Sequence, residues 1–573
     1  MSSSPRSPPT DLTRKPSSAT DGRTERVGGV KGDGGKKSSA PRGALEPRGV
    51  LVLKTPAGTG NAVTGARACG PWIFSNQVLS CSLRDPAEKA SQTCGSSQGS
   101  AAPSSAPGAG DEPGSSASTT ETALVRVQDE RGVSYGVAYY NRHALISARF
   151  LSEDADELID HNFFLSRFRT ALQSRMSFSR SFSWSMHGHS QRDTVDVCRS
   201  EFHGGDKATE VRDMFFRLVN GEGDGLPGLV VDLYGEYACI QSLTRGMDSL
   251  MPLATAALRS LLSLGGILVR RDRPDRALEF PHAEGAGDTD RSFAAWRSEP
   301  VVAEGVIPSH VVLAENGCAF AVDLRAQPET GKCWKKLQRA QWKIPRDIAL
   351  NKKPVGALRR QCLAWYGAPP RWRFDRREFR RQVALLSAGK RVLDLSGHSA
   401  ACGITCVHLG KADRCVVVDN NEQSAMLALK GMNLNGITSA RLEVQQEDVD
   451  TWLKNYASRL VSDGDPCYFD VVILDLPNLA WRKSDVPGAR ASLRQLVETV
   501  ARVTAPGGYL AITNSSRHYS QGTFLADASV ACASAGRDAV LCAEGGAGFD
   551  FPVDVRLPRS PELQWTILEL SER

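Results

Sequence analysis

The pattern of hydrophobic and polar residues is clearest between Val392 and Asp419. The apolar run Val392–Leu395 predicts a strand buried on both faces, and a loop of small residues and a helix follow it. A second apolar run, Cys415–Val418, predicts the next strand and ends at Asp419. This order is typical of a nucleotide-binding α/β sheet, where small residues let the ligand approach the backbone and the carboxylate binds two ribose hydroxyls. The loop is poor in glycine, so a merely structural βαβ unit is an equal alternative.

The same alternation of strands and helices continues to the C-terminus. Helices are predicted at 422–433, 449–460 and 490–504, and strands at 441–445, 468–474 and 509–513. Acidic residues end three successive strands at one edge of this sheet: Asp419, Asp448 and Asp475. Because ligands sit at the carboxyl ends of parallel strands, these residues predict a nucleoside cofactor next to a reacting base.

The N-terminal half shows shorter, β-rich patterns. Strands are predicted from Gly49 and again from Ala123, on either side of the low-complexity stretch 95–121, and together they predict one small barrel. A helix with Phe163, Phe164, Phe168 and Leu172 on one face follows, and the polar stretch 174–193 is expected to be a loop. Its two histidines, His187 and His189, are interpreted as solvated rather than metal-binding.

Two hairpins are predicted in the middle of the chain. One turns at Gly235-Glu236, and the other, from Val312 to Leu324, turns at Asn316-Gly317. Between them a helix at 249–263 and a strand at 266–271 indicate a small α/β linker domain. Residues 281–299 are expected to form a loop insertion.

Composition narrows the class of protein. The chain has room for roughly three or four domains, and its 573 residues carry a net charge of only +6. The 14 cysteines form no CxxC pair, which argues against a zinc ribbon and a secreted disulfide framework. No long apolar run or signal core occurs, so we expect a soluble protein of the cytoplasm or an organelle matrix, without membrane or metal.

Residues 332–391 concentrate positive charge. They hold 18 Lys/Arg and three Asp/Glu, a local net charge of 18 − 3 = +15. Cations neutralise phosphates and aromatic faces stack on unpaired bases, so the mixture suits single-stranded or looped RNA; the alternative is a solvated basic insertion. The aromatic residues interleaved there are Trp334, Trp342, Trp365, Tyr366, Trp372 and Phe374. The candidate RNA-binding residues are Lys335, Lys336, Arg359, Arg360 and Trp365.

Several motifs resemble one family. The stretch RLVNGEGDGLPGLVVDLYG resembles the linker motif R-L-x-x-G-E-S-D-G-L-P-G-L-x-V-D-x-Y-G of the PUA-containing cytosine-5 methyltransferases of large-subunit ribosomal RNA. GPWIFSNQV is similar to the start of their PUA domain, a small RNA-binding β-barrel. Glu329-Thr330-Gly331 resembles their K-T-G, and Phe374-Asp375-Arg376-Arg377 their L-D-Q-R. The resemblance covers nearly the whole chain from Gly49.

The resemblance implies an α/β fold: a Rossmann-like class I methyltransferase domain (374–573) preceded by a PUA-like β-barrel (49–155), an α/β linker domain (156–325) and a basic aromatic insertion (326–373). Residues 1–48, rich in Ser, Pro and Gly, are expected to be a disordered basic segment. The resemblance also implies an S-adenosylmethionine (SAM)-dependent enzyme that methylates a nucleobase of RNA, with a homodimer as a possible state. The implied cofactor-binding residues are Asp375, Arg377, Asp394, Ser396, Gly397, His398, Ser399, Asp419, Asn420, Glu447, Asp448 and Asp475. The implied catalytic residues are Asp475, Pro477, Asn478 and Ser515.

The chain departs from the family at its reactive positions. The family's donor loop F-S-Y-T-G-G is replaced by Ser396–Ala401, so that both glycines become alanine, and D-P-P-K becomes Asp475-Leu476-Pro477-Asn478. An alanine is poorly tolerated where φ is positive. The family's S-C-S is Asn514-Ser515-Ser516, so the nucleophilic cysteine is replaced by Ser515.

We expect Ser515 not to act as a nucleophile, because a hydroxyl is far less acidic than a thiol and needs an adjacent base. His518 has no evident orienting carboxylate, and Cys467 precedes its strand and should lie at the opposite edge. The enzyme would then methylate a nitrogen, such as guanine N7, as the resemblance of this segment to the S-N-N-K-R of related enzymes implies. The alternative is a catalytically impaired RNA-binding pseudo-methyltransferase acting in ribosome assembly.

Overall fold

The computed structural model describes most of the chain from Leu45 onward. The described residues are 45–54, 70–83, 122–181, 214–271, 276, 279, 301–325, 372–395, 397–462, 468–480, 483–557 and 563–572. The chain divides into two compact units, Met1–Arg42 and Gly43–Arg573, and all described residues belong to the second. The low-complexity stretch 95–121, the loop 281–299 and the candidate RNA-binding residues lie outside the described residues.

The first sheet joins the two β-rich segments that the low-complexity stretch separates. It contains β1 (Gly49–Leu53), β2 (Trp72–Phe74), β3 (Val78–Leu83), β4 (Thr122–Asp129), β5 (Ser134–Asn141) and β6 (Ile146–Ser152). The strand order is β2-β6-β5-β4-β1-β3, and β1 pairs with β4 in parallel and with β3 antiparallel. Alternate residues such as Leu51, Val125 and Val127 face a shared small core. The predicted pairing of the two segments is confirmed.

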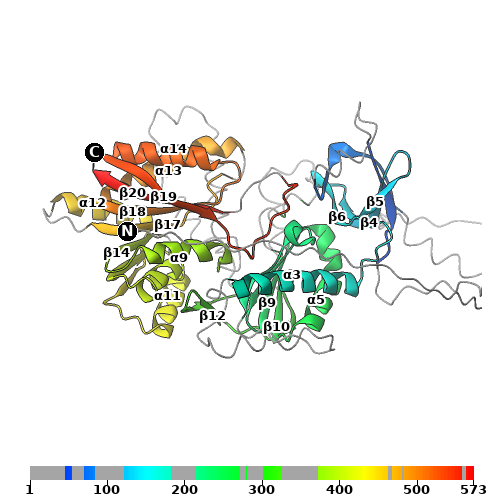
Figure 1. Cartoon of the computed structure of the whole chain (residues 1–573), viewed down its shortest axis with the longest axis horizontal. Coiled ribbons are helices and arrows are strands. Elements are labelled where there is room, and N and C mark those ends of the chain that lie inside the picture. Colours follow the sequence, from blue (N-terminus) through cyan, green and yellow to red (C-terminus); the bar gives the residue numbers. More distant parts are fainter. Residues whose placement is uncertain are drawn as a thin grey trace, which may run out of the picture. The chain divides into compact units, whose positions relative to one another are not determined.

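The linker region is built on a second sheet. It contains β7 (Phe215–Asn220), β8 (Leu229–Tyr234), β9 (Tyr237–Ser242), β10 (Gly266–Arg270) and β11 (Val301–Gly305), in the order β11-β10-β9-β8-β7. The predicted hairpin turn lies between β8 and β9, where Gly235 has a φ of 60°. Helix α5 (Arg245–Leu261) begins at Thr244, whose side chain accepts a hydrogen bond from the Met247 amide, and its apolar face covers the sheet together with α3 (His161–Ser181) (Figure 1).

The prediction of a loop over 174–193 is wrong in its first part, because α3 continues to Ser181. The helix continues there because Arg175 and Met176 are buried against the linker sheet. Arg175 makes a bidentate ion pair with Asp224, at 2.7 Å for both contacts. A polar residue at this position therefore belongs to an interface rather than to a solvated loop.

The second predicted hairpin contacts the C-terminal domain. Strands β12 (Val311–Glu315) and β13 (Cys318–Val322) flank Asn316 and Gly317, whose φ angles of 53° and 73° suit the predicted turn. The backbone of Ala319 exchanges two hydrogen bonds with the side chain of Asn435, which follows α11 (Glu422–Leu434). The hairpin thus joins the linker region to the last sheet.

The third large sheet has seven strands. They are β14 (Arg391–Leu395), β15 (Arg414–Val418), β16 (Leu442–Gln445), β17 (Phe469–Leu474), β18 (Thr504–Asn514), β19 (Arg537–Gly546) and β20 (Gln564–Glu572). The order is β16-β15-β14-β17-β18-β20-β19, with the first five parallel and β20 antiparallel to both of its neighbours. Chain order therefore reverses at β14, which creates a switch point between β14 and β17.

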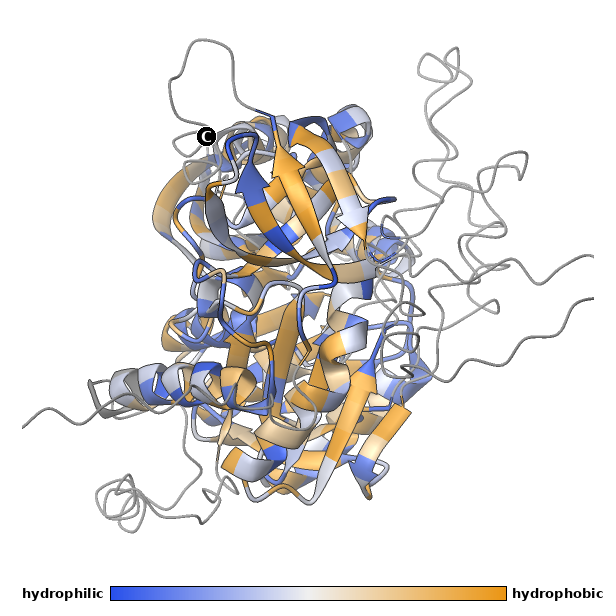
Figure 2. Cartoon of the chain, turned by 90° about the vertical axis from the view of Figure 1, so that its right-hand side faces the viewer, coloured by the Kyte–Doolittle hydropathy of each residue, from blue (hydrophilic) through white to orange (hydrophobic). Residues whose placement is uncertain are grey.

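Helices cover both faces of this sheet. Helices α9 (Arg377–Leu385), α10 (Ala401–His408) and α11 pack on one face, and α12 (Val449–Ser462), α13 (Val486–Val503) and α14 (Gln521–Ser534) pack on the other (Figure 1). Successive strand residues point to opposite faces, so Val392 joins the first core and Leu393 the second. This explains why the strands are nearly continuous hydrophobic runs. Figure 2 colours the chain by hydropathy and draws many of its strand segments in orange. The α/β fold predicted for the C-terminal domain is confirmed.

Candidate active site at the carboxyl edge of the last sheet

The predicted acidic residues lie at one edge of the seven-stranded sheet. Asp394 lies within β14, and Asp419, Asp448 and Asp475 lie just beyond the carboxyl ends of β15, β16 and β17. These four strands are parallel neighbours, so their carboxyl ends share one edge. Asp394 and Asp475 flank the switch point, which is where open α/β sheets bind their ligands.

The loop after β14 adopts a strained backbone. His398 and Ala400 have φ angles of 46° and 57°, in the left-handed region that favours glycine. Gly397 packs so closely that a Cβ there would lie 2.5 Å from Val417 Cγ1 and 3.0 Å from Asp394 Oδ2. The loop therefore keeps the shape that a glycine-rich loop would have, although only one of its described residues, Gly397, is glycine. Ser399 is half-buried in it, and Ser396 lies outside the described residues.

Replacing Ala400 by glycine is expected to change the free energy of unfolding by less than about 1 kcal/mol, because relief of left-handed strain offsets both the entropy that glycine loses on folding and the loss of a methyl group. Ala400 is fully buried in the core, so the methyl group removed is a packed one. Urea unfolding of the purified chain measures the effect. Ala401, the first residue of α10, is the matched control. Ala401→Gly relieves no strain and should lose about 1 kcal/mol, and an equal or larger loss in Ala400→Gly would contradict the strain argument.

Asp419 is bound by backbone amides but keeps accepting capacity. Its Oδ2 accepts the His398 amide at 3.0 Å and its Oδ1 accepts the Asn421 amide at 2.9 Å. Each carboxylate oxygen has two lone pairs, so one remains on each oxygen for a ligand hydroxyl. The His398 ring, half-exposed, lies beside the same carboxylate with Nδ1 at 3.7 Å from Oδ2. The geometry suits recognition of a vicinal diol.

Asp394 is the buried carboxyl group of the site. Its Oδ2 accepts the Gly403 amide at 3.0 Å, while its Oδ1 has no hydrogen-bond partner among the described residues. Burial raises the pKa of Asp394 to about 7, against the lowering effect of the Gly403 amide. An unsatisfied buried oxygen at this edge favours a ligand that brings an N–H donor or a positive charge.

The predicted cofactor-binding residues Asp448, Glu447 and Asn420 are more exposed than Asp394 and Asp419. Asp448 is exposed, and its Oδ1 accepts the Thr451 amide at 3.1 Å near the start of α12. Glu447 is half-buried, and Asn420 is exposed. Asp448 therefore has a structural role in α12 and keeps its second oxygen available to the edge where Asp419 lies.

Arg376 links the residues at the ends of β17 and β18. Its Nε donates to Asp475 Oδ1 at 3.2 Å, its Nη2 to Ser515 Oγ at 2.8 Å, and its Nη1 to Asp375 at 2.5 Å. The Arg376 side chain is 2% exposed. Burial alone would lower the pKa of Arg376, but Asp375 and Asp475 raise it above its ordinary value. Arg376 is therefore a fixed cation at the reacting end of the site.

Sequence reasoning missed Arg376 and selected its neighbours instead. Burial would raise the pKa of Asp375, but Arg373 and Arg376 together hold it well below its usual range. Asp375 thus serves as the counter-ion of Arg376. The available signal was the motif itself, in which Arg376 stands where the family has glutamine.

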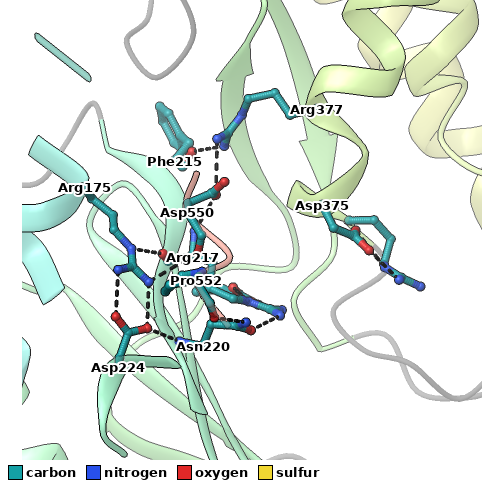
Figure 3. A network of polar contacts seen from close by, with 11 residues as sticks. Arg175, Phe215, Arg217, Asn220, Asp224, Asp375, Arg377, Asp550 and Pro552 are labelled. Carbon is teal, nitrogen blue, oxygen red and sulfur yellow. Dashed lines mark hydrogen bonds and ion pairs between the residues drawn. The ribbon is translucent and has the colours of Figure 1, made fainter. Parts of the chain in front are cut away.

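The guanidinium of Arg377 lies elsewhere, at the contact with the linker region (Figure 3). It donates to Asp550 Oδ2 at 3.2 Å, to the Phe215 carbonyl at 2.6 Å and to Glu315 Oε2 at 3.3 Å. Asp550 also accepts the Arg217 amide at 3.1 Å. These hydrogen bonds all belong to this contact, so the structure brings Arg377 together with the linker and not with the strand-end carboxylates.

The loop after β17 is attached to β18 by side-chain hydroxyls. The Leu476 amide donates to Thr513 Oγ1 at 2.8 Å, and the Leu479 amide donates to Ser516 Oγ at 2.7 Å. Asn478 accepts the Ala480 amide through its Oδ1, which leaves its NH2 group available. Pro477 and Asn478 are both half-buried, beside Asp475. The four predicted catalytic residues are therefore brought to one edge of the sheet.

Two of the aromatic residues expected to stack on RNA are core residues. Trp372 and Phe374 are 4% and 2% exposed, and the Trp372 ring lies 4.7 Å from that of Phe320. The basic residues Arg377 and Arg380 are likewise paired with buried carboxylates. The interpretation of 332–391 as one RNA-facing surface is therefore wrong for its C-terminal end, from Trp372 onward.

Among the described residues, no group of three or more His, Cys, Asp or Glu side chains could hold a metal ion. No described helix is long and apolar enough to cross a membrane.

Comparisons with known proteins agree with this architecture. Residues 111–153 match the PUA-like domain family. A solved structure from Streptococcus mutans, described as a SAM-dependent methyltransferase, has a TM-score of 0.53 and 16% identity over 78% of this chain and 91% of its own. A second structure of this kind is complexed with SAH and matches equally well. The chain thus has the fold of the PUA-containing class I methyltransferases.

Curated relatives point to one branch of that class. The chain is 25% identical over 439 residues to ribosomal RNA large subunit methyltransferase I of Aeromonas salmonicida, covering 76% of this chain and 87% of the relative. It is 23% identical over 440 residues to the enzyme of the same name in Klebsiella pneumoniae. The resemblance inferred from the motifs is confirmed, and the chain is a divergent relative of these enzymes.

Proposed function

We propose that this protein transfers a methyl group from SAM to a nucleobase of RNA, with ribosomal RNA as the substrate class. The observation that carries the proposal is the carboxyl edge of the last sheet. There the Asp394 and Asp419 carboxylates, around the Gly397 loop, lie at the same edge as Asp475, Arg376 and Ser515. The names of the curated relatives support ribosomal RNA as the acceptor.

The residues of the edge fit a SAM molecule. Asp419 would bind the two ribose hydroxyls with its remaining lone pairs, and the unsatisfied Oδ1 of Asp394 would face the cationic methionine end. Gly397 provides a close approach that no larger residue could give, because a Cβ there would meet Val417. Asp448 and Glu447 would flank the adenine. SAM supplies an activated methyl group, and the protein contributes position and electrostatics.

RNA contact is proposed for two regions. The PUA-like sheet, β1–β6, would bind a folded part of the RNA, as the resemblance implies. The basic segment before Trp372, including Lys335, Lys336, Arg359, Arg360 and Trp365, would contact phosphates and an unpaired base. Both contacts would raise the local concentration of RNA at the site without choosing the methylated atom.

Tritiated SAM and separate RNA pools test the proposal. The purified full chain is incubated with unmodified large-subunit ribosomal RNA, small-subunit ribosomal RNA or transfer RNA, and label in precipitated RNA is counted. We expect label in large-subunit RNA. RNA binding without label in any pool, at saturating SAM, would favour the rival function of an RNA-binding pseudo-methyltransferase instead.

A further inference from the structure

The polarity of the Arg376–Ser515 contact restricts what Ser515 can do. A guanidinium has donors only, so in the 2.8 Å contact Arg376 donates and Ser515 Oγ accepts. The hydroxyl hydrogen of Ser515 must then point away from Arg376. Ser515 is half-buried at the end of β18, so this hydrogen is available to a group bound at the same edge. Ser515 is set up as a hydrogen-bond donor.

Among the described residues, no base is in hydrogen-bond contact with Ser515 Oγ. Arg376 cannot accept a proton, and the partner of Ser515 Oγ among the described residues is Arg376. His518 is exposed and makes no described contact with Ser515. Cys402 is the described cysteine whose thiol is influenced electrostatically by both Asp394 and Asp475. Burial raises the pKa of this thiol well above its ordinary value. The described residues of this edge therefore present no thiolate.

Without a nucleophile, carbon 5 of cytosine is excluded as the methyl acceptor, whereas a nitrogen of a base is not. Carbon 5 of cytosine becomes reactive only after a nucleophile adds to carbon 6 of the ring, a covalent step of the kind that a thiolate performs. A nitrogen of a base has its own lone pair and needs only to be positioned. Asp475 keeps Oδ2 largely available, since its shortest contacts, with Arg376 and Thr513, are made by Oδ1.

We propose that Ser515, Arg376 and Asp475 bind the acceptor base as a hydrogen-bonding clamp, and that the methylated atom is a nitrogen and not carbon 5 of cytosine. The proposal rests on the methyltransferase function proposed above. Ser515 donates to a carbonyl oxygen or ring nitrogen of the base, and Asp475 accepts an N–H. Arg376 fixes the direction of the Ser515 hydrogen bond and holds Asp475 in place.

The step balances without a further reactant. The nitrogen lone pair forms the bond to the methyl carbon while the carbon–sulfur bond breaks, and its electron pair stays on sulfur. The positive charge passes from sulfur to the base, and where the nitrogen carries a hydrogen, that proton leaves to Asp475. Arg373 and Arg376 together neutralise Asp375 and Asp475, so the Asp475 carboxylate is the group that would stabilise a cationic base.

Nucleoside mass spectrometry with SAM bearing a CD3 methyl group tests the inference directly. The full chain is reacted with unmodified large-subunit ribosomal RNA, and the RNA is digested to nucleosides. We expect the CD3 label in an N-methylated nucleoside. Label in 5-methylcytidine would overturn the inference and leave the proposed function standing. Label in no nucleoside, with SAM bound, would overturn both.

Variants separate a clamp from a nucleophile. Ser515→Ala should lower kcat/KM for RNA by about tenfold, as expected for one lost hydrogen bond, whereas loss of a nucleophile would abolish transfer. Ser534→Ala, an exposed serine of α14, is the matched control and should change nothing. Complete loss of transfer in Ser515→Ala, with the SAM Kd unchanged, would contradict the clamp.

Arg376→Gln restores the residue that the family motif has and tests the role of the guanidinium. We expect kcat/KM for RNA to fall by about ten- to a hundred-fold with the SAM Kd changed by no more than about twofold. Thermal unfolding monitors the fold, since Arg376 is buried between two carboxylates, and Arg376→Lys keeps the charge if the glutamine variant does not fold. Unchanged kcat/KM in either folded variant would overturn the assignment of Arg376.

Discussion

Asp419→Ala is expected to weaken SAM binding by about ten- to a hundred-fold. A carboxylate that accepts two hydroxyl hydrogen bonds in a largely buried site contributes on the order of 1.5–3 kcal/mol, which corresponds to that change in Kd. The Asp419 side chain is 8% exposed, so water replaces the lost contacts poorly. Isothermal titration calorimetry of the full chain with SAM measures the effect.

The controls for this prediction lie on the same strand. Asp413 precedes β15 at its amino end and is exposed, while Asp419 follows β15 at its carboxyl end, so Asp413→Ala changes the same charge at the opposite edge of the sheet. It should leave the SAM Kd unchanged. Asp419→Asn keeps one acceptor oxygen, for either the His398 or the Asn421 amide, and turns an NH2 group toward the other, so it should lose SAM affinity together with one loop contact. If wild type gives no heat at millimolar SAM, the proposed donor site is wrong.

The parts of the site that lie on regular elements could be predicted from the sequence. Asp419 and Asp475 directly follow apolar runs, and parallel strands necessarily present their carboxyl ends together. Ala400 could be predicted as a strained position only through the resemblance, because nothing local to an alanine indicates a φ of 57°. The hydrophobic pattern and the motifs therefore predicted which edge of the sheet carries the candidate site, but not the contacts that its side chains make.

The parts that depend on long-range contacts could not be predicted. Arg376 and Arg377 are adjacent in sequence and chemically identical, yet one contacts Asp475 and Ser515, 99 and 139 residues away, and the other contacts Asp550, 173 residues away. A 3₁₀ turn at Phe374–Arg376 that leads into α9 directs the two side chains apart. Charge counting over 332–391 treated both as surface cations, although both are buried and paired with distant carboxylates.

Those pairings connect the two halves of the fold. In Figure 3 Arg377, Asp550 and Arg217 converge where the segment after β19 meets β7, and Arg175 reaches the Asp550 carbonyl at 3.3 Å. Since Arg376 and Arg377 are consecutive, the position of the acceptor clamp depends on the ionic contacts of its neighbour. Buried charges are maintained only when every partner is present. The stability of this cluster is therefore a condition for the geometry of the active site.

Glu315→Ala is expected to lower the free energy of unfolding by about 3–5 kcal/mol, because it removes the carboxylate partner of the buried Arg380 and leaves Arg377 with Asp550 alone. The Glu315 side chain is fully buried at the end of β12 and is paired with Arg377 at 3.3 Å and Arg380 at 2.6 Å. Urea unfolding followed by tryptophan fluorescence measures the loss. Glu498→Ala is the matched control, since Glu498 pairs with Arg502 on the exposed face of α13, where such a pair contributes about 0.3–0.5 kcal/mol. Equal small losses in both variants would show that the buried cluster does not hold the linker against the catalytic domain.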